Sequence, residues 1–208
     1  MKCVIHGSGG VGGYYGGCLT RAGHEVFFIA RGAHLDAIQK QGLSIKSAKG
    51  DFRIETPKSG ERCDPNFYPD LVIVAVKSWQ LPEITKEIKN YCTPSTLILP
   101  LQNGADASDI LADTLGPERV LGGLTKIFSK IEAPGVINHF TGATYIGFGE
   151  YFQDPQFQNA PDSLSERCRN LEKELDSTPG IDAEALADIQ KELWRKMLIF
   201  VSTSGVGT

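Results

Sequence analysis

The sequence lacks the features that mark several large classes of protein. None of its apolar runs reaches the length that a membrane-spanning helix needs. It has no cluster of basic residues and its formal net charge is −4, so we expect neither nucleic acid nor an anionic membrane as a partner. Glycines interrupt the short apolar stretch at the N-terminus, which is not the pattern of a signal peptide. We therefore expect a cytoplasmic protein.

Patterns typical of metal and disulfide sites are also missing. The five cysteines are odd in number and have no C-x-x-C spacing, which favours reduced thiols over a disulfide framework or a zinc site. His24, His34 and His139 have no partners at metal-ligand spacing, and the motifs H-E-x-x-H and G-x-S-x-G do not occur. We expect no bound metal. His6, directly before a glycine-rich segment, is expected to pack in the core.

The segment from Lys2 to Arg31 carries the strongest pattern that is present. Cys3–His6 is a short apolar strand, a helix of small and apolar residues runs to Ala22, and Glu25–Ala30 is a second strand. The loop between the first strand and the helix has the pattern G-x-G-x-x-G and consists of Gly7, Ser8, Gly9, Gly10, Val11 and Gly12. In this position of a βαβ unit, such a loop is typical of dinucleotide binding.

The three glycines of the pattern have separate functions in that setting. Gly7 permits a tight turn out of the strand, Gly9 lets the backbone approach a pyrophosphate, and Gly12 lets the helix pack closely on the strand. The N–H groups at the start of the helix point toward the phosphates. The alternative is a glycine loop with no ligand, which the strand and helix on either side disfavour.

Arg31 indicates which dinucleotide is bound. An NAD site usually carries Asp or Glu at the end of the second strand, where it holds the ribose hydroxyls. This chain has Arg31 there, and a guanidinium can pair with a 2′-phosphate that a carboxylate would repel. The sequence therefore favours NADP (NADPH) over NAD, with a solvated arginine as the alternative.

The rest of the first half continues the alternation of strands and helices. The apolar runs Leu71–Val76, Thr96–Leu101 and Val120–Leu124 predict buried parallel strands, with helices near Pro82–Tyr91 and Ala107–Leu115 between them. This alternation predicts an α/β fold with a doubly wound, Rossmann-type parallel sheet.

From Lys126 onward the rhythm changes. Three short strands, Lys126–Glu132, Val136–Phe140 and Ala143–Phe148, predict an antiparallel meander appended to the sheet, and Leu43–Glu55 predicts a small hairpin. A polar loop and a further helix follow, and Asp188 is the expected N-cap of a last helix. We expect a dinucleotide-binding domain over residues 1–184, and over residues 185–208 the first helix of a C-terminal helical domain that the chain cuts short.

Polar residues follow the predicted parallel strands, where ligands of open α/β sheets bind. Lys77 can reach a phosphate or a ribose, and the amide of Asn103 can hold the nicotinamide ribose or a substrate because it both donates and accepts. Thr125 and Lys126 are weaker candidates. The alternatives are a solvated lysine at 77 and a simple Asn-Gly turn at 103.

Lys196 lies on the last helix, at the border of its apolar stripe. Partial burial lowers the pKa of a lysine, which makes Lys196 a candidate acid or electrophile. Sequence physics alone favours the alternative, a surface ion pair between Glu192 and Lys196 one helical turn apart.

Further motifs follow the glycine loop in a fixed order: G-H-E-V at 23–26, A-V-K-S-W-Q at 75–80, L-Q-N-G at 101–104, T-Y-I-G at 144–147 and L-W-R-K at 193–196. Together they resemble the ketopantoate reductases (2-dehydropantoate 2-reductases). The resemblance implies that the glycine loop holds the pyrophosphate of NADP and that Arg31 and Lys77 serve its phosphate and ribose region. It also implies that Asn103 lies beside nicotinamide and substrate, and that Lys196 is catalytic.

The implied reaction is the NADPH-dependent reduction of a small 2-oxo acid to a 2-hydroxy acid, with 2-dehydropantoate to pantoate in pantothenate biosynthesis as the leading case. Phe200 stands where the family often has an asparagine that contacts the substrate, which leaves another 2-oxo acid or an imine as an alternative. The family continues into a helical domain beyond this chain, which leaves an NADP-binding module or redox sensor without catalysis as a second alternative. A homodimer is compatible with each.

Overall fold

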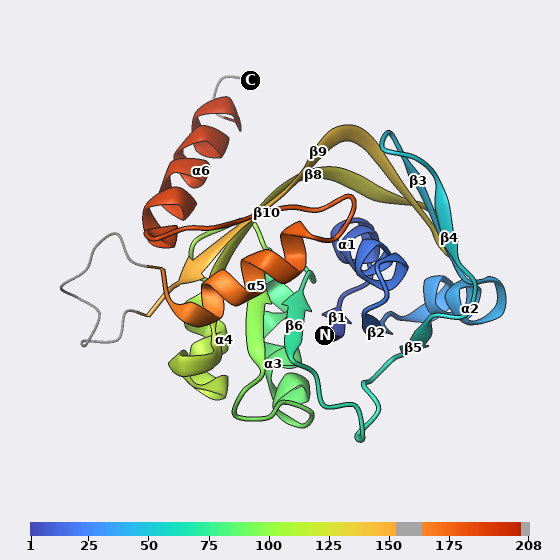
Figure 1. Ribbon diagram of the computed structural model, residues 1–208, viewed down its shortest axis with the longest axis horizontal. Coiled ribbons are helices and arrows are strands. Elements are labelled where there is room, and N and C mark those ends of the chain that lie inside the picture. The colour runs from blue at the N-terminus through green and yellow to red at the C-terminus, as the bar shows by residue number, and fades with distance from the viewer. Residues whose placement is uncertain (153–163, 205–208) are drawn as a thin grey trace.

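The computed structural model describes residues 1–152 and 164–204, with side chains described through residue 198. The first half of the chain forms a five-stranded sheet in which every neighbouring pair is parallel (Figure 1). Its strands, in spatial order, are β5 (Lys58–Gly60), β2 (Glu25–Ile29), β1 (Lys2–His6), β6 (Leu71–Val74) and β7 (Leu97–Pro100). The chain builds outward from β1 on one side and then crosses to the other, which confirms the doubly wound arrangement.

Helices cover both faces of this sheet because successive residues of each strand point to opposite sides. Ile5 of β1 shares one core with Leu19, whereas its neighbour Val4 shares the other core with Ile84. The first face is covered by α1 (Gly10–Arg21) and α2 (Gly32–Gln41), and the second by α3 (Leu81–Lys89) and α4 (Ala107–Leu115). Both faces of the sheet are therefore buried, as the continuous apolar runs predicted.

A second sheet packs on the other side of α1. Its order is β10-β9-β3-β4, and β8 pairs with β9 as well. The strands are β3 (Leu43–Ser47), β4 (Phe52–Ile54), β8 (Leu121–Ala133), β9 (Val136–Glu150) and β10 (Asp182–Ala185). The long strands β8 and β9 arch over α1 (Figure 1). The glycine loop before α1 consequently lies between two sheets.

Glycines allow α1 to fit between the sheets. A Cβ on Gly16 would lie 2.7 Å from the side chain of Ile5 in the parallel sheet, and one on Gly17 would lie 3.1 Å from Ile45 in the second sheet. Both distances are tighter than ordinary van der Waals contact. The small residues of α1 are thus required by close packing on two opposite faces of the helix.

The predicted antiparallel region is present, but it is one long hairpin instead of three short strands. The turn expected at Thr141–Gly142 does not form, and β9 runs through it from Val136 to Glu150. Val120–Leu124, predicted as a strand of the parallel sheet, instead leads into β8, and a single parallel bridge from Ile98 to Val120 joins it to that sheet. The local turn preference of Thr and Gly appears only as a register shift inside β9, between the pairs Ile127–Thr144 and Ser129–His139.

The remaining elements follow the predictions more closely. The helix α5 (Glu166–Asp176) lies where a helix was expected, and α6 spans Ile189–Ser204. Asp188 caps α6, because its Oδ1 accepts a hydrogen bond of 3.0 Å from the backbone N–H of Lys191. Most of the predicted polar loop after Tyr151 lies outside the described residues. The predicted domain boundary between residues 184 and 185 stays a prediction.

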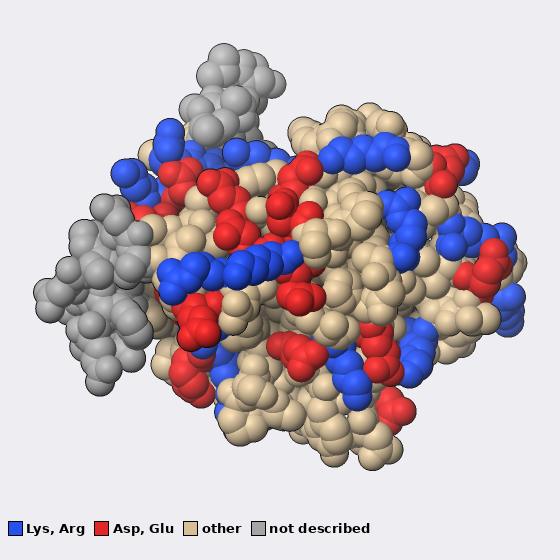
Figure 2. All heavy atoms as spheres, in the orientation of Figure 1, with Lys and Arg blue, Asp and Glu red and all other residues tan. Residues whose placement is uncertain are grey.

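Charges are mixed over the surface shown in Figure 2, where acidic and basic side chains alternate and no large area carries basic side chains alone. No helix in residues 1–152 and 164–204 is long and apolar enough to cross a membrane. In the same residues, no group of three or more His, Cys, Asp or Glu side chains could hold a metal ion. The five cysteines are free, and burial raises the pKa of Cys3 to about 12, so this thiol is a poor nucleophile.

Candidate functional site

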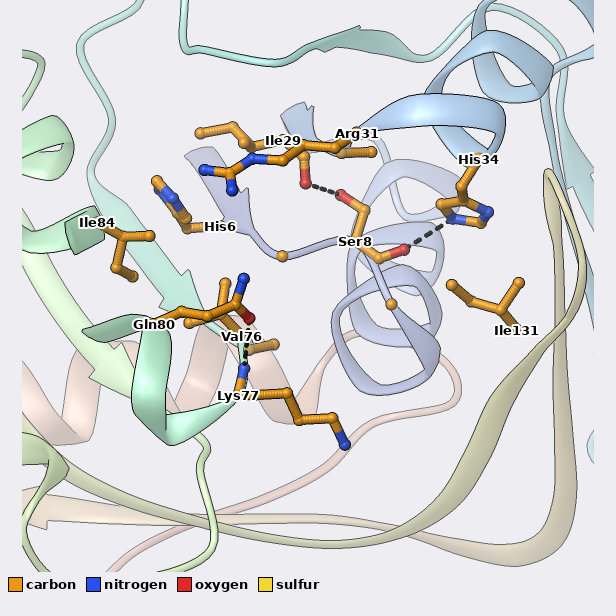
Figure 3. A pocket seen from close by; sticks show the side chains of 14 residues that line it. His6, Ser8, Ile29, Arg31, His34, Val76, Lys77, Gln80, Ile84 and Ile131 are labelled. Carbon is orange, nitrogen blue, oxygen red and sulfur yellow. Dashed lines mark hydrogen bonds between the residues drawn. The ribbon is translucent and has the colours of Figure 1, made fainter. Parts of the chain in front are cut away.

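A cleft of about 260 Å³ opens at the carboxyl ends of β1, β2 and β6 (Figure 3). This is the point where the strand order reverses, because β1 pairs with β2 on one side and with β6 on the other. The residues around the cleft include Gly7, Gly9, Arg31, His34, Lys77 and Ile131. Ile131 comes from β8, so the second sheet supplies one wall of a cleft that belongs mainly to the first.

The glycine loop has the geometry that dinucleotide binding needs. Gly7 has a φ of +102°, a conformation that favours glycine, and a Cβ there would lie 2.7 Å from Val76. A Cβ on Gly9 would meet no protein atom within 4 Å, so the backbone at Gly9 faces open space. α1 starts at the next residue, and no side chain caps it within the described chain. The first N–H groups of α1 are therefore oriented to bind an anion.

The side chain of Ser8 stabilises the fold, although its place in the glycine loop suggested contact with a cofactor. Its side chain is buried, and both its backbone N–H and its Oγ donate hydrogen bonds of 3.0 Å to the carbonyl oxygen of Ile29. The hydroxyl thus fastens the glycine loop to the end of β2. We expect any contact of Ser8 with a cofactor to come from its backbone.

His34 of α2 also contacts the glycine loop, a role that its sequence position did not indicate. Its Nε2 lies 2.9 Å from the carbonyl oxygen of Ser8, and its Nδ1 lies 3.1 Å from the backbone nitrogen of Gly135 in the β8–β9 turn. Burial lowers the pKa of His34 below its ordinary value. The ring connects α2, the glycine loop and the second sheet.

Arg31 lies at the mouth of the cleft beside two carboxylates of α3. Its Nη2 is 3.8 Å from Oε1 of Glu83 and 3.9 Å from Oε1 of Glu87, and its side chain is half exposed. Exposed ion pairs of this length contribute little to stability, so the guanidinium can be recruited by a ligand. Arg31 lies at the end of β2 as predicted, but its acidic neighbours come from α3 and could not be predicted from the local sequence.

His6 forms part of the floor of the cleft and is a packing residue, as expected. Its Nδ1 lies 2.9 Å from the hydroxyl of Tyr91. Burial, reinforced by the charge of Arg31, lowers the pKa of His6 to about 4. The imidazole is therefore neutral at physiological pH and adds no charge to the cleft.

Lys77 follows β6 and lines the same cleft. Its backbone N–H donates to Oε1 of Gln80 at 3.1 Å, which starts the short 3₁₀ turn Ser78–Gln80. The Lys77 side chain extends from this turn along the cleft (Figure 3). The next residue links this edge to a second cluster, because Oγ of Ser78 donates to the backbone oxygen of Asn103 at 3.5 Å.

That second cluster brings Asn103 and Lys196 together across 93 residues of sequence. Nζ of Lys196 donates to Oδ1 of Asn103 at 3.0 Å and to the backbone oxygen of Thr125 at 2.9 Å. Burial, with a smaller contribution from the charge of Lys126, lowers the pKa of Lys196 to about 8. Glu192, the surface partner considered above, lies 2.8 Å from Arg195 instead.

Thr125 positions Lys196 through a buried hydrogen-bond network. Its Oγ1 lies 2.5 Å from the hydroxyl of Tyr15 and donates to the backbone oxygen of Tyr145 at 3.0 Å. This network fixes the part of β8 whose carbonyl receives the lysine. Thr125, a weak candidate from the sequence, contacts Lys196 through its main-chain oxygen and not through its side chain.

Two other sequence features have different outcomes. Nε2 of Gln102 donates to the carbonyl oxygens of Val74 and Val76 at 3.0 and 3.1 Å, so this buried amide ties β7 to the end of β6. The side chain of Phe200 lies outside the described residues, and its substrate role stays a prediction.

Comparison with known proteins identifies the family to which this arrangement belongs. A profile described as Ketopantoate reductase PanE/ApbA matches residues 3–151. The chain belongs to the ketopantoate reductase family. Its relatives include an uncharacterized oxidoreductase, YkpB, of Bacillus subtilis, which is 32% identical over all of this chain and 65% of its own length. A 2-dehydropantoate 2-reductase of Pyrococcus abyssi is 29% identical over all of this chain and 64% of its own length.

Solved structures agree with the family assignment. A 2-dehydropantoate 2-reductase from Geobacter metallireducens superposes with a TM-score of 0.83 and 29% identity, covering 94% of this chain and 61% of its own. A D-mandelate dehydrogenase with NADH shares the fold at a TM-score of 0.79 and 24% identity, covering 94% of this chain and 60% of its own. The chain spans less than two thirds of the length of these relatives.

Proposed function

We propose that the protein reduces a small 2-oxo acid to the corresponding 2-hydroxy acid with NADPH, and that 2-dehydropantoate, which yields pantoate, is the leading substrate. The contact of 3.0 Å between Nζ of Lys196 and Oδ1 of Asn103 carries this proposal. It places a lysine with a lowered pKa next to the loop that borders the dinucleotide cleft. Family membership supports the same reaction class.

The residues of the cleft fit a dinucleotide phosphate. The open space at Gly9 and the uncapped start of α1 suit a pyrophosphate, and the half-exposed guanidinium of Arg31 suits a 2′-phosphate. The exposed ammonium of Lys77 adds a second cation on the opposite side of the cleft. NADPH, when bound, supplies the hydride that reduces the 2-oxo carbon.

Lys196 supplies the proton. As the carbonyl carbon is reduced, the carbonyl oxygen gains negative charge, and the ammonium of Lys196 stabilises that charge and transfers a proton to it. The product is a neutral hydroxyl, and the lysine left without its proton takes another from solvent. Asn103 and the carbonyl of Thr125 accept hydrogen bonds from the ammonium and hold it in one orientation.

The test is NADPH oxidation by the protein over a panel of 2-oxo acids and their imines. The Lys196→Ala variant should lower turnover by at least about a hundredfold, because a positioned proton donor contributes about 10²–10⁴-fold. The dissociation constant of NADPH should stay nearly unchanged. Lys191→Ala is the matched control, since Lys191 is an exposed lysine on the same helix. Wild-type turnover in the Lys196 variant would contradict the proposed mechanism.

The panel also separates the alternatives. Phe200, in place of an asparagine expected to contact substrate, favours a 2-oxo acid other than 2-dehydropantoate or an imine, and the preferred substrate would show this directly. Tight NADPH binding with no turnover on any member would instead indicate an NADP-binding module or sensor. The molar mass in solution tests whether the protein forms a homodimer.

A further inference from the structure

His34 lies where three parts of the molecule meet beside the cleft. It belongs to the first turn of α2, directly after the Arg31–Gly32 corner, and its ring lies between the glycine loop and the β8–β9 hairpin. Figure 3 shows the ring with one edge toward Ser8 on the border of the cleft. It therefore contacts the loop that would receive the pyrophosphate without occupying the open space of the cleft at Gly9.

The two hydrogen bonds of His34 determine its protonation and tautomer. A carbonyl oxygen can only accept, so Nε2, 2.9 Å from the oxygen of Ser8, must carry the hydrogen. The backbone N–H of Gly135 donates to Nδ1, which must then be unprotonated. His34 is thus a neutral ring that donates to one element and accepts from another.

Both partners of His34 are themselves anchored. Ser8 is buried and gives two further hydrogen bonds to Ile29, so His34 completes the fixation of this loop residue. Gly135 is also held by its oxygen, which accepts a hydrogen bond of 2.9 Å from the N–H of Ser44 in β3. The ring is the bridge through which the second sheet is joined to the glycine loop at this point.

We propose that His34 is a positioning residue for the cofactor: it holds the backbone of Ser8, and with it the glycine loop, in the conformation that receives the pyrophosphate. The proposal rests on the dinucleotide binding in the proposed function. Because the pyrophosphate is common to both nicotinamide cofactors, loss of His34 should weaken NADPH and NADH equally. This distinguishes His34 from Arg31, whose loss should affect NADPH alone.

Two amide variants separate the two bonds of the ring. In His34→Asn the side-chain oxygen lies near the position of Nδ1 and can accept from Gly135, but no donor reaches Ser8. In His34→Gln the amide nitrogen lies near the position of Nε2 and can donate to Ser8. His34→Phe retains a ring of similar shape and loses both bonds.

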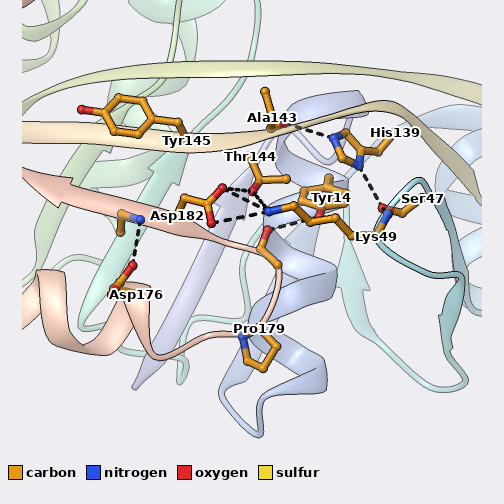
Figure 4. A network of polar contacts seen from close by, with 12 residues as sticks. Tyr14, Ser47, Lys49, His139, Ala143, Thr144, Tyr145, Asp176, Pro179 and Asp182 are labelled. Carbon is orange, nitrogen blue, oxygen red and sulfur yellow. Dashed lines mark hydrogen bonds and ion pairs between the residues drawn. The ribbon is translucent and has the colours of Figure 1, made fainter.

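His139 provides the matched control. It is a buried histidine that also makes two hydrogen bonds: its Nε2 donates to the carbonyl oxygen of Ala143 at 3.0 Å, and its Nδ1 accepts from Oγ of Ser47 at 2.9 Å (Figure 4). Its network joins β3, β9 and β10 through Lys49 and Asp182 and includes no residue of the glycine loop. His139→Gln should lower the melting temperature and leave cofactor affinity unchanged.

The experiment measures dissociation constants of NADPH and NADH by fluorescence titration, together with the melting temperature of each variant. We expect His34→Asn and His34→Phe to bind both cofactors about tenfold more weakly, since one or two backbone hydrogen bonds that hold the loop are lost. His34→Gln should stay within about threefold of the wild type. The ratio of the NADPH and NADH constants should not change in any variant.

Several results would overturn the inference. One is wild-type affinity in both His34→Asn and His34→Phe; another is an equal loss in His139→Gln, which would indicate general destabilisation. If His34→Phe does not fold, the Asn and Gln variants decide, and equal constants for these two would refute a role for the Ser8 contact. Cofactor binding is measured without turnover. If no 2-oxo acid were reduced, that result would contradict the reductase proposal but not the role of His34. A wild type that binds neither cofactor would overturn both.

Discussion

The lowered pKa of Lys196 should appear as a fall in turnover at moderately alkaline pH. With a pKa of about 8, about nine tenths of the lysine is protonated at pH 7 and about one tenth at pH 9. Because the protonated form donates the proton, turnover should fall about tenfold between these pH values. A lysine at the ordinary value of 10.5 would remain almost fully protonated over the same range.

A second variant tests the cause of this shift. Burial is the larger contribution and the positive charge of Lys126 the smaller, so Lys126→Met should raise the pKa of Lys196 without restoring the ordinary value. The alkaline fall should then move to higher pH. Nζ of Lys126 lies 4.9 Å from the ring centre of Tyr145 in a cation–π contact, and methionine removes the charge while its sulfur can still pack on the ring. Lys130→Met is the matched control, since Lys130 is an exposed lysine on the same strand.

The assay is the initial rate of NADPH oxidation at saturating substrate between pH 6 and pH 10, with rates corrected for the stability of NADPH. Lys196→Arg should lower turnover and remove the alkaline fall from the activity that remains, because a guanidinium stays charged throughout this range but does not release its proton. A turnover that is flat from pH 7 to pH 9 in the wild type would refute the assignment of the proton to Lys196. An equal shift in the Lys126 and Lys130 variants would refute the electrostatic explanation.

Two further predictions concern the cofactor cleft. We expect NADPH to bind about tenfold to a hundredfold more tightly than NADH, and Arg31→Ala should remove most of this preference. Glu83→Gln should strengthen NADPH binding, because the Glu83 carboxylate, 3.8 Å from the guanidinium, competes with the 2′-phosphate. Titration with NADPH and NADH at two salt concentrations measures both effects, and equal wild-type affinities would contradict the role of Arg31. Gly9→Ala should weaken the binding of both cofactors but leave the melting temperature unchanged, since its Cβ meets no protein atom within 4 Å. Gly16→Ala should instead lower the melting temperature, because its Cβ would lie 2.5 Å from the side chain of Phe28. A loss of stability in Gly9→Ala would show that the space at this glycine is needed by the protein itself.

Local patterns predicted the elements whose shape depends on neighbours in sequence. The glycine loop, the strands β1, β2, β6 and β7 and the N-cap at Asp188 follow from residue types at fixed short spacings, and the structure has each of them. The length of β9 could not be predicted in this way. Thr141–Gly142 has the composition of a turn, but it forms a register shift inside β9, between residues that pair with β8 on both sides of it. β5 was missed because Lys58–Gly60 is short and polar and forms an edge strand.

In the candidate site, too, local patterns identified single residues but not the contacts between distant ones. Lys196 and Asn103 were each identified from the sequence, but only the fold shows that they lie 3.0 Å apart. The helical periodicity favoured a surface ion pair between Glu192 and Lys196. The actual partner, the carbonyl of Thr125 in β8, is far away in sequence and does not affect that periodicity. The role of His34 could not be inferred because its partners are backbone atoms, which leave no mark on the sequence.

The strand β8 contacts both ends of the site. At Thr125 its carbonyl receives Lys196, and at Ile131 its side chain forms the wall beside the glycine loop. These residues are six positions apart along the strand, which corresponds to about 20 Å of extended chain. The length of β8 therefore sets the distance between Lys196, which delivers the proton in the proposed reaction, and the glycine loop, where the phosphates would lie. A deletion of one residue between Thr125 and Ile131 would shorten that distance by about 3.3 Å and turn the side chain of Ile131 to the other face of the sheet. Changes of the exposed side chains of this segment, such as Phe128 and Lys130, should therefore be tolerated better than changes of its length.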